Sequence, residues 1–260
     1  MKKIKIDVVL IATLRPEILE ITLNSFYHKL LKNFDVRLIV NVDPIGDKKY
    51  TQQDIINVCK KYFSNITIRS PGSASFSKAV QWGWQQVKSD IFFHLEDDWC
   101  LKKDVDTKLV NNYFLEPNMV SISLNIKSNK EYVEQTYKAN DPNNKLYIGL
   151  ALRPSFFRTS YIREQLEKFD VTLDPEKQFS RNITTKNFTN PIFKYYGGIN
   201  DGSMIIDTGK YWREKNKFNK WDLSSKDITY QTKKTKFVTL FYYTCKYYFL
   251  KTYWNVLYCK

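Results

Sequence analysis

Residues 90–99 read DIFFHLEDDW, and this stretch decides the fold. Its apolar first half predicts a buried strand, and three consecutive carboxylates, Glu96, Asp97 and Asp98, follow directly. Open α/β sheets bind ligands outside the carboxyl ends of their strands, so these acids are expected at a binding edge. Carboxylate oxygens suit Mg²⁺ and Mn²⁺, which usually combine one or two protein carboxylates with substrate phosphates. The stretch favours a metal-assisted site for a nucleoside diphosphate over a solvated acidic turn.

The residues around this stretch alternate between strand and helix patterns. Apolar runs predict strands at residues 4–12, 36–42, 66–69, 90–99 and 120–124. Apolar residues at helical spacing predict the helices between them, at residues 18–30, 55–63, 76–87 and 105–114. Repeated βα units of this length indicate an α/β fold, a Rossmann-like three-layer sandwich with a mostly parallel central sheet.

The pattern loosens after residue 125, where loops and short strands are expected up to residue 150. A helix is predicted at residues 161–169, and another begins at Asp174-Pro175. Asp is a good N-cap and Pro suits the first helical position. Without internal repeats or Gly/Ser linkers, a single domain is expected.

Composition limits the classes of function. The four cysteines show no metal-ligand spacing, and two histidines cannot complete a zinc cluster with them, so reduced thiols in a cytoplasmic protein are expected. The opening MKKIKIDVVLIAT is interpreted as the first strand and not as a signal peptide. The formal net charge is +14, and residues 208–260 carry twelve Lys/Arg against three Asp/Glu, or +9. Such a field attracts nucleic acid, anionic lipid or a phosphorylated substrate.

The last residues, 237–260, are aromatic and basic together and predict a helix. Such a helix can pack against the domain as its last element, which the number of aromatics favours. It can also lie peripherally on an anionic membrane surface. Contact with nucleic acid is a third interpretation of the same charge.

Polar residues follow several of the predicted strands. Thr13 and Arg15 come after the first strand, Asp43 ends the second, and the acids at 96–98 end the fourth. In this order the motifs resemble those of GT-A fold glycosyltransferases, most of all the inverting family 2. The resemblance implies a GT-A-like fold in which the acids form the DxD element that holds the metal and touches the ribose.

The resemblance covers residues 4–125 and, more weakly, residues 150–215. It implies Mn²⁺ or Mg²⁺ bound by Asp98 together with Asp97. It also implies a nucleotide-sugar site, with contacts expected from Thr13, Arg15, Asp43, Lys78, Glu96, Asp97 and Arg213. The chain departs from the family in having Glu at the first DxD position and Ser77-Lys78-Ala79 where Arg-Asn-Gly is usual.

The segment DPEKQFSR, residues 174–181, looks like a variant of the family's catalytic Glu-Asp motif, with Lys177 in the second acidic position. The resemblance implies Glu176 as the base that deprotonates the acceptor, with Asp174 as the second choice. Alternatively, both residues have structural roles. Asp174 then caps the start of a helix, and the negative charge of Glu176 in the first turn complements the helix dipole.

A second polar cluster, GGINDGSMIIDTGKYWR, spans residues 197–213. Arg213 is expected to neutralise the leaving diphosphate, whose negative charge grows during glycosidic cleavage. A solvated basic face is the alternative. Acceptor-binding residues are expected at Tyr147, Arg153, Phe156 and Asp201.

The leading hypothesis is a metal-dependent transferase that moves a sugar from a nucleoside-diphosphate sugar, UDP-sugar first, to a hydroxyl. A glycan, a lipid-linked sugar or a protein would all fit as the acceptor. Residues 1–125 are then the donor half, 126–236 the acceptor and catalytic half, and 237–260 the basic aromatic helix. A glycosyltransferase acting on modified DNA is the second hypothesis, because of the charge of residues 208–260. A non-catalytic nucleotide-sugar-binding protein is the third, and a nucleotidyltransferase lacks its Gly-rich signature here.

Overall fold

The computed structural model describes residues 3–124, 137–138, 150–179, 183–196 and 203–216, together with Cys245 and Tyr248. The strands are β1 (Ile4–Leu14), β2 (Phe34–Gly46), β3 (Ile66–Arg69), β4 (Ile91–Glu96), β5 (Trp99–Leu101), β6 (Met119–Leu124), β7 (Tyr137–Lys138), β8 (Ser155–Arg158), β9 (Ile192–Tyr196) and β10 (Ile205–Asp207). The helices are α1 (Pro16–Lys29), the 3₁₀ turn η1 (Leu31–Asn33), α2 (Gln52–Lys60), α3 (Phe76–Gln85), α4 (Thr107–Tyr113), α6 (Thr159–Leu166), α7 (Pro175–Phe179) and α8 (Gly209–Asn216).

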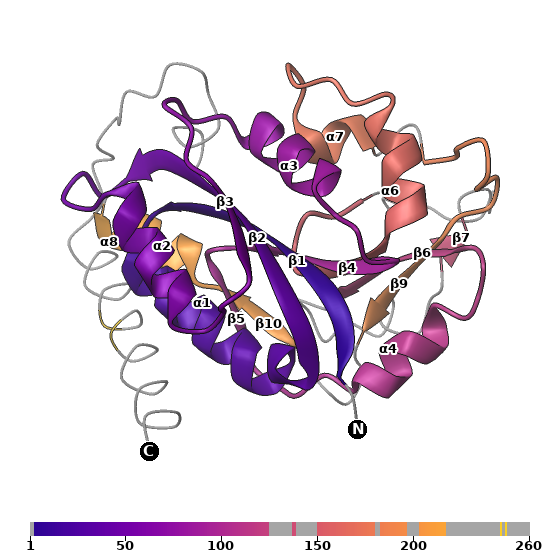
Figure 1. Ribbon diagram of the computed structural model, residues 1–260, viewed down its shortest axis with the longest axis horizontal. Helices are drawn as coiled ribbons and strands as arrows, with labels where there is room; N and C mark the ends of the chain where they lie inside the picture. The colour runs from indigo at the N-terminus through magenta and orange to yellow at the C-terminus, as the bar shows by residue number, and fades with distance from the viewer. Residues whose placement is uncertain are drawn as a thin grey trace.

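One twisted sheet forms the centre of the molecule, with strand order β3-β2-β1-β4-β8-β6-β9-β7 (Figure 1). The neighbouring strands β3, β2, β1 and β4 are parallel, and so are β6 and β9. β8 runs antiparallel between β4 and β6. The carboxyl ends of β1, β2 and β4 therefore meet at one edge, which is where the sequence predicts the ligand site.

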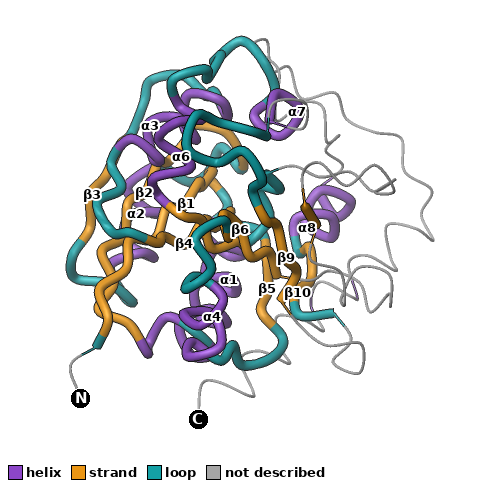
Figure 2. Tube along the Cα trace, turned by 90° about the vertical axis from the view of Figure 1, so that its right-hand side faces the viewer, coloured by secondary structure: helices purple, strands orange, loops and turns teal. Residues whose placement is uncertain are grey.

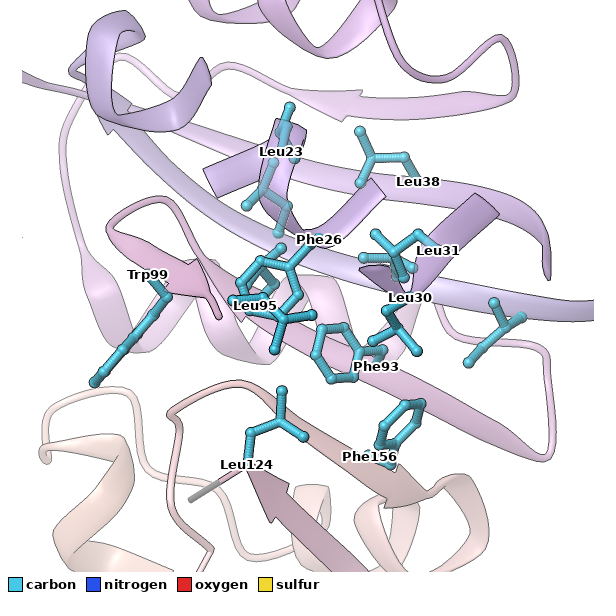
Figure 3. Packing of buried hydrophobic residues seen from close by; sticks show 14 of the residues in the cluster. Leu23, Phe26, Leu30, Leu31, Leu38, Phe93, Leu95, Trp99, Leu124 and Phe156 are labelled. Carbon is cyan, nitrogen blue, oxygen red and sulfur yellow. The ribbon is translucent and has the colours of Figure 1, made fainter. Parts of the chain in front are cut away.

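Helices cover both faces of the sheet, as two views at 90° to each other show (Figures 1 and 2). Because side chains alternate along a strand, the even-numbered residues of β1 from Ile6 to Leu14 pack under α1, α2 and α4, while Val9 and Ile11 pack under α3. Figure 3 shows the first of these cores, where Phe26 of α1 lies 5.7 Å, between ring centroids, from Phe93 of β4. The predicted three-layer α/β fold with a mostly parallel sheet is confirmed.

The local signals at two helix starts are also confirmed. Pro16 occupies the first turn of α1. Asp174 caps α7, because its Oδ1 accepts a hydrogen bond of 2.9 Å from the backbone N–H of Glu176. The predicted strand at 90–99, in contrast, is wrong in its length. It turns at Asp97 and Asp98, and residues 99–101 form β5, which pairs with β10 and not within the large sheet.

The expected helix at 237–260 lies outside the described residues except for two positions. Tyr248 is one of them, and the Nζ atom of Lys215 in α8 lies 4.7 Å from the centroid of its ring. In the described part of the chain, no helix is long and apolar enough to cross a membrane.

At the opposite edge of the sheet, near the amino ends of β1 and β2, a buried ion pair joins the two strands. Asp7 of β1 is 4% exposed and accepts two hydrogen bonds of 2.7 Å from the guanidinium of Arg37 in β2. The backbone N–H groups of Lys88 and Ser89 also donate to Asp7. Burial alone would raise the pKa of Asp7, but these hydrogen bonds outweigh burial and lower it. The pair therefore joins β1, β2 and the loop before β4.

We expect Asp7→Asn to lower the free energy of unfolding by about 3 kcal/mol at pH 7, since it leaves Arg37 without its charge partner. The folded-state pKa of Asp7 lies below its ordinary value, so its contribution is complete above about pH 4 and disappears as the pH falls further. Urea unfolding at pH 7 and pH 3 measures this difference, with Asp35→Asn, on an exposed side chain of β2, as the control. A loss as large at pH 3 as at pH 7 would contradict the charge argument.

Candidate active site

Asp97 connects the ends of β1 and β4. Its Oδ2 accepts hydrogen bonds from the backbone N–H and the hydroxyl of Thr13, at 2.8 and 2.9 Å. Its Oδ1 accepts from Nη2 of Arg15, and its backbone C=O accepts from the Thr22 hydroxyl of α1 at 2.7 Å. The side chain is 2% exposed. Asp97 is thus a structural connection between two strands and a helix.

Arg15 is buried with Asp97. Its Nε donates to the Thr13 hydroxyl at 2.6 Å, and its guanidinium lies 5.4 Å from the ring centroid of Trp212 in α8. Burial opposes the charge, but Asp97 and Asp98 outweigh it and raise the pKa of Arg15. Its Nη1 is buried without a hydrogen-bond partner among the described residues. Arg15 therefore serves as the counter-charge of the acidic turn.

These contacts give Asp97 and Arg15 structural roles that the sequence did not predict. Asp97 was expected to bind metal, and Arg15 to contact the nucleotide. Both carboxylate oxygens of Asp97 are engaged by Thr13 and Arg15, and the exposed fractions of the Asp97 and Arg15 side chains are 2% and 5%. Both side chains therefore hold the loop after β1 against the turn after β4, and their ligand roles stay predictions.

Asp98 is the carboxylate that faces outward, with a side chain 15% exposed. Its Oδ2 lies 3.3 Å from Nη2 of Arg15 and 3.6 Å from Nη1 of Arg213. Arg213, in α8, also lies 3.7 Å from Oδ2 of Asp207 through its Nη2. The structure therefore brings the predicted metal ligand and the predicted diphosphate ligand, Asp98 and Arg213, into contact.

Glu96, the first residue of the DxD element, is partly buried, and its Oε2 accepts a hydrogen bond of 2.9 Å from the indole of Trp99. Burial raises its pKa well above the ordinary value, and the charges of Asp98 and Glu176 raise it further. Because the charge of Glu176 acts on the carboxylate of Glu96, α7 lies near the same edge of the sheet.

Glu176 is exposed in the first turn of α7. Its Oε1 accepts a hydrogen bond of 2.9 Å from the backbone N–H of Leu152, which orients the carboxylate. Arg153, the next residue, lies 5.2 Å from the ring centroid of Tyr195 in β9. The structure therefore places the predicted base and one predicted acceptor residue in adjacent positions. Asp174 has the capping role that the structural alternative describes.

Asp43 lies at the end of β2 in a buried polar pocket and is 5% exposed. Its Oδ1 accepts from the Asn41 amide at 2.8 Å, and its Oδ2 accepts from the backbone N–H of Ser75 at 3.2 Å. Arg69, at the end of β3, donates to Oδ1 of Asn41 at 3.2 Å. Burial raises the pKa of Asp43, although these hydrogen bonds oppose the shift. Lys78 is exposed in the first turn of α3, beside this pocket.

Three acceptor expectations have different outcomes. Tyr147 and Asp201 lie outside the described residues. Phe156 is fully buried in β8, and its ring centroid lies 4.7 Å from that of Phe93 in β4. Because β8 inserts between β4 and β6, this ring becomes part of the core (Figure 3), and its acceptor role stays a prediction.

Sequence reasoning missed three residues of this edge. Asn41 is a polar residue inside an otherwise apolar strand, and Arg69 ends the neighbouring parallel strand, so strand-end polarity would have found both. Gly209 belongs to the predicted cluster at residues 197–213, but its contact was not predictable from the sequence. In the structure it lies directly against Asp98.

A divalent cation is the predicted cofactor, and the residues present fit one that arrives with a phosphate ligand. In the described part of the chain, no group of three His, Cys, Asp or Glu side chains could hold a metal ion. Asp98 is partly exposed, and no described residue bonds to its Oδ1. Because Mg²⁺ and Mn²⁺ commonly use one or two carboxylates and complete their shell with substrate phosphates, one carboxylate suffices.

Replacing Asp97 or Asp98 by Asn should change the free energy of unfolding by different amounts. We expect Asp97→Asn to lower the free energy of unfolding by about 3 to 5 kcal/mol, because Arg15 remains buried without a charge partner. Asp98→Asn, at a partly exposed position, should change it by about 1 kcal/mol or less. Denaturant unfolding of both variants and wild type checks this. Equal losses for the two variants would contradict the structural role of Asp97.

No protein-family model matches the chain, and no curated protein matches it in sequence. Solved structures do match. The structure of residues 1–349 of S. aureus TarS superposes with a TM-score of 0.58 and 14% identity, over 83% of this chain and 64% of that one. GalNAc-T7, crystallised with UDP, GalNAc and Mn²⁺, superposes with a TM-score of 0.51 and 12% identity, over 74% and 43%.

TarS has also been crystallised with UDP-GlcNAc, and that structure superposes with a TM-score of 0.53 and 14% identity, over 76% of this chain and 59% of that one. At these identities the likeness establishes the fold. Three observations agree on the fold: the parallel half of the sheet, the acidic turn after β4 and these superpositions. The chain has the GT-A fold of glycosyltransferases.

Proposed function

We propose that this chain is an inverting glycosyltransferase that moves a sugar from a UDP-sugar to an acceptor hydroxyl, with Mn²⁺ or Mg²⁺ as its cofactor. The observation that carries the proposal is the contact between Asp98 and Arg213 at the carboxyl edge that Asp43 also reaches. A carboxylate for a cation and a guanidinium for a phosphate stand together there, which suits a diphosphate. The complexes of TarS and GalNAc-T7 with UDP support the choice of donor.

On the donor side, we assign Asp43 to an N–H group of the base, because carboxylate oxygens accept such hydrogen bonds. Asn41 and Arg69 hold Asp43 in position. Glu96 and Lys78 are assigned to the sugar and phosphate portions of the nucleotide. Thr13 orders the first loop through Asp97.

At the diphosphate, we assign Asp98 as the protein ligand of the divalent cation. When bound, the cation supplies Lewis-acid stabilisation of the diphosphate. Arg213 lies 3.6 Å from Asp98 and is placed to neutralise the charge that grows on the leaving group. Once the carboxylate of Asp98 binds a cation, the guanidinium of Arg213 is available to the phosphate.

On the acceptor side, we assign Glu176 as the general base. The bond between the acceptor oxygen and the anomeric carbon forms while the bond to the diphosphate breaks, and Glu176 takes the hydroxyl proton. Its hydrogen bond from Leu152 fixes the carboxylate, and Arg153 beside it is assigned to the acceptor. Tyr147 and Asp201, outside the described residues, remain predicted acceptor contacts.

A glycan or lipid-linked sugar is the acceptor class we propose, and modified DNA stays the alternative. Its motivation is the +9 charge of residues 208–260. In the described part of that segment, Arg213 lies beside Asp98 and Lys215 packs on Tyr248, so these two cations serve the fold and the donor site. Peripheral binding of the remaining basic tail to a membrane or nucleic acid, in the cytoplasm, stays a prediction.

The first test is a donor-hydrolysis and transfer assay with UDP-sugars in Mn²⁺ or Mg²⁺. We expect wild type to release UDP, and Asp98→Asn to lose about 1000-fold in kcat/KM, because the cation loses its protein ligand. Asp104→Asn, which removes an exposed carboxylate six residues further along the chain, is the control and should retain full activity. Full activity of Asp98→Asn, or equal activity in excess EDTA, would contradict the assignment of the cation site.

The second test concerns the base. We expect Glu176→Gln to lower kcat by about 100- to 10,000-fold while the KM for the donor stays unchanged, because the side chain acts on the acceptor proton. Steady-state transfer kinetics measure both constants. The control is Glu167→Gln, which removes an exposed carboxylate after α6. A raised donor KM with unchanged kcat would place Glu176 in donor binding instead.

The third test concerns the base pocket. Asp43→Asn should weaken UDP binding about 10- to 100-fold, because a charged hydrogen-bond acceptor becomes neutral. Isothermal titration with UDP measures the Kd, with Asp47→Asn in the following turn as the control. An unchanged Kd would remove Asp43 from the nucleotide site.

A further inference from the structure

The first residue of α8 lies unusually close to the proposed cation ligand. A Cβ atom built on Gly209 would overlap Oδ2 of Asp98 and would stand 2.6 Å from its Cγ and 2.9 Å from its Cβ. Side-chain carbons do not approach other heavy atoms below 3.0 Å, so any other residue at 209 forces a displacement. Either α8 or the carboxylate would have to move.

The start of α8 cannot easily retreat. The backbone N–H and the hydroxyl of Thr208 both donate to the backbone C=O of Asp98, at 2.8 and 2.7 Å. Trp212, one turn further, is 4% exposed and packs on Ile18 of α1. β10, immediately before α8, pairs with β5, immediately after the acidic turn, as Figure 2 shows. The helix start and the turn therefore form one unit, and the carboxylate is the part that would move.

The carboxylate itself is held on one side only. Its Oδ2 faces Gly209, Arg15 and Arg213. Its Oδ1 takes no bond from any described residue. The missing side chain at 209 thus allows Oδ2 to rest against α8.

We propose that Gly209 is a positioning residue that sets the orientation of the Asp98 carboxylate for the divalent cation. The inference rests on the proposed function and goes beyond it, because it assigns a specific determinant of cation affinity to a residue that touches neither cation nor donor. Displacement of Asp98 by a methyl group at 209 weakens the cation site and leaves the base pocket at Asp43 intact.

Three Gly→Ala variants separate this role from a general loss of packing. Gly209→Ala tests the inference. Gly83→Ala is the packing control, since a Cβ there would stand 2.6 Å from Cγ1 of Val9 in the core. Gly72→Ala is the neutral control, since a Cβ there has nothing within 4 Å. Each variant is measured by thermal melting and by titration with Mn²⁺ in saturating UDP. In the titration, the electron paramagnetic resonance signal measures the concentration of free Mn²⁺.

We expect Gly209→Ala to raise the apparent Kd for Mn²⁺ by about 10- to 100-fold, the usual effect of disturbing a group that orients a metal ligand. Its Kd for UDP in EDTA should equal that of wild type. Gly83→Ala should melt at a lower temperature with an unchanged Kd for Mn²⁺, and Gly72→Ala should match wild type in both. Unchanged Mn²⁺ affinity in Gly209→Ala, or an equal loss in Gly83→Ala, would overturn the inference.

Two further outcomes are decisive. If Gly209→Ala melts too low for titration, the double variant Asp98→Ala/Gly209→Ala should recover most of the melting temperature, because the overlapping oxygen and carboxyl carbon are gone and only the 2.9 Å contact with Cβ of residue 98 remains. Failure to recover would overturn the inference, since the conflict would then lie elsewhere. If wild type itself binds no Mn²⁺ with UDP, the proposed function fails, and this inference fails with it. Binding in wild type with no difference in Gly209→Ala overturns the inference alone.

Discussion

The ion pair between Arg15 and Asp97 is the interaction on which the site depends. It closes the loop after β1 against the turn after β4, and Thr13 and Thr22 complete the connection. A buried pair of this kind is stable only when its remaining hydrogen-bonding groups find partners, and Asp97 has them on both oxygens. With Asp97 fixed inward, the next residue along the turn must face outward. The position of Asp98 follows from the burial of its neighbour.

The same turn organises the second half of the chain. It ends β4 and begins β5, whose partner β10 leads into α8. Thr208, Gly209 and Arg213 of that segment all contact Asp98, so residues more than 100 positions apart in sequence meet at one carboxylate. The donor edge of the sheet therefore combines two separate regions of the chain, and the proposed chemistry needs both.

Periodicity alone predicted much of the fold. β1, β3, α1 and the start of α7 agree with their sequence patterns, because apolar spacing, Pro16 and Asp174 are local signals. The roles within Glu96–Asp98 were not predictable, since three adjacent acids look alike until their partners are known. The burial of Phe156 in the core was not predictable for a related reason. A four-residue strand that inserts antiparallel between two others depends on distant pairing, which no local pattern reveals.

We propose that Asp98, and not Asp97, is the carboxylate that binds the cation. The diphosphate of the donor completes the coordination shell of that cation. A crystal structure of the protein with UDP and Mn²⁺, with anomalous scattering used to locate the manganese, tests it most directly. We predict a single manganese peak within coordination distance of Asp98 and both phosphates, with Asp97 still bound to Arg15. Manganese on Asp97, or UDP bound away from the ends of β2 and β4, would contradict it.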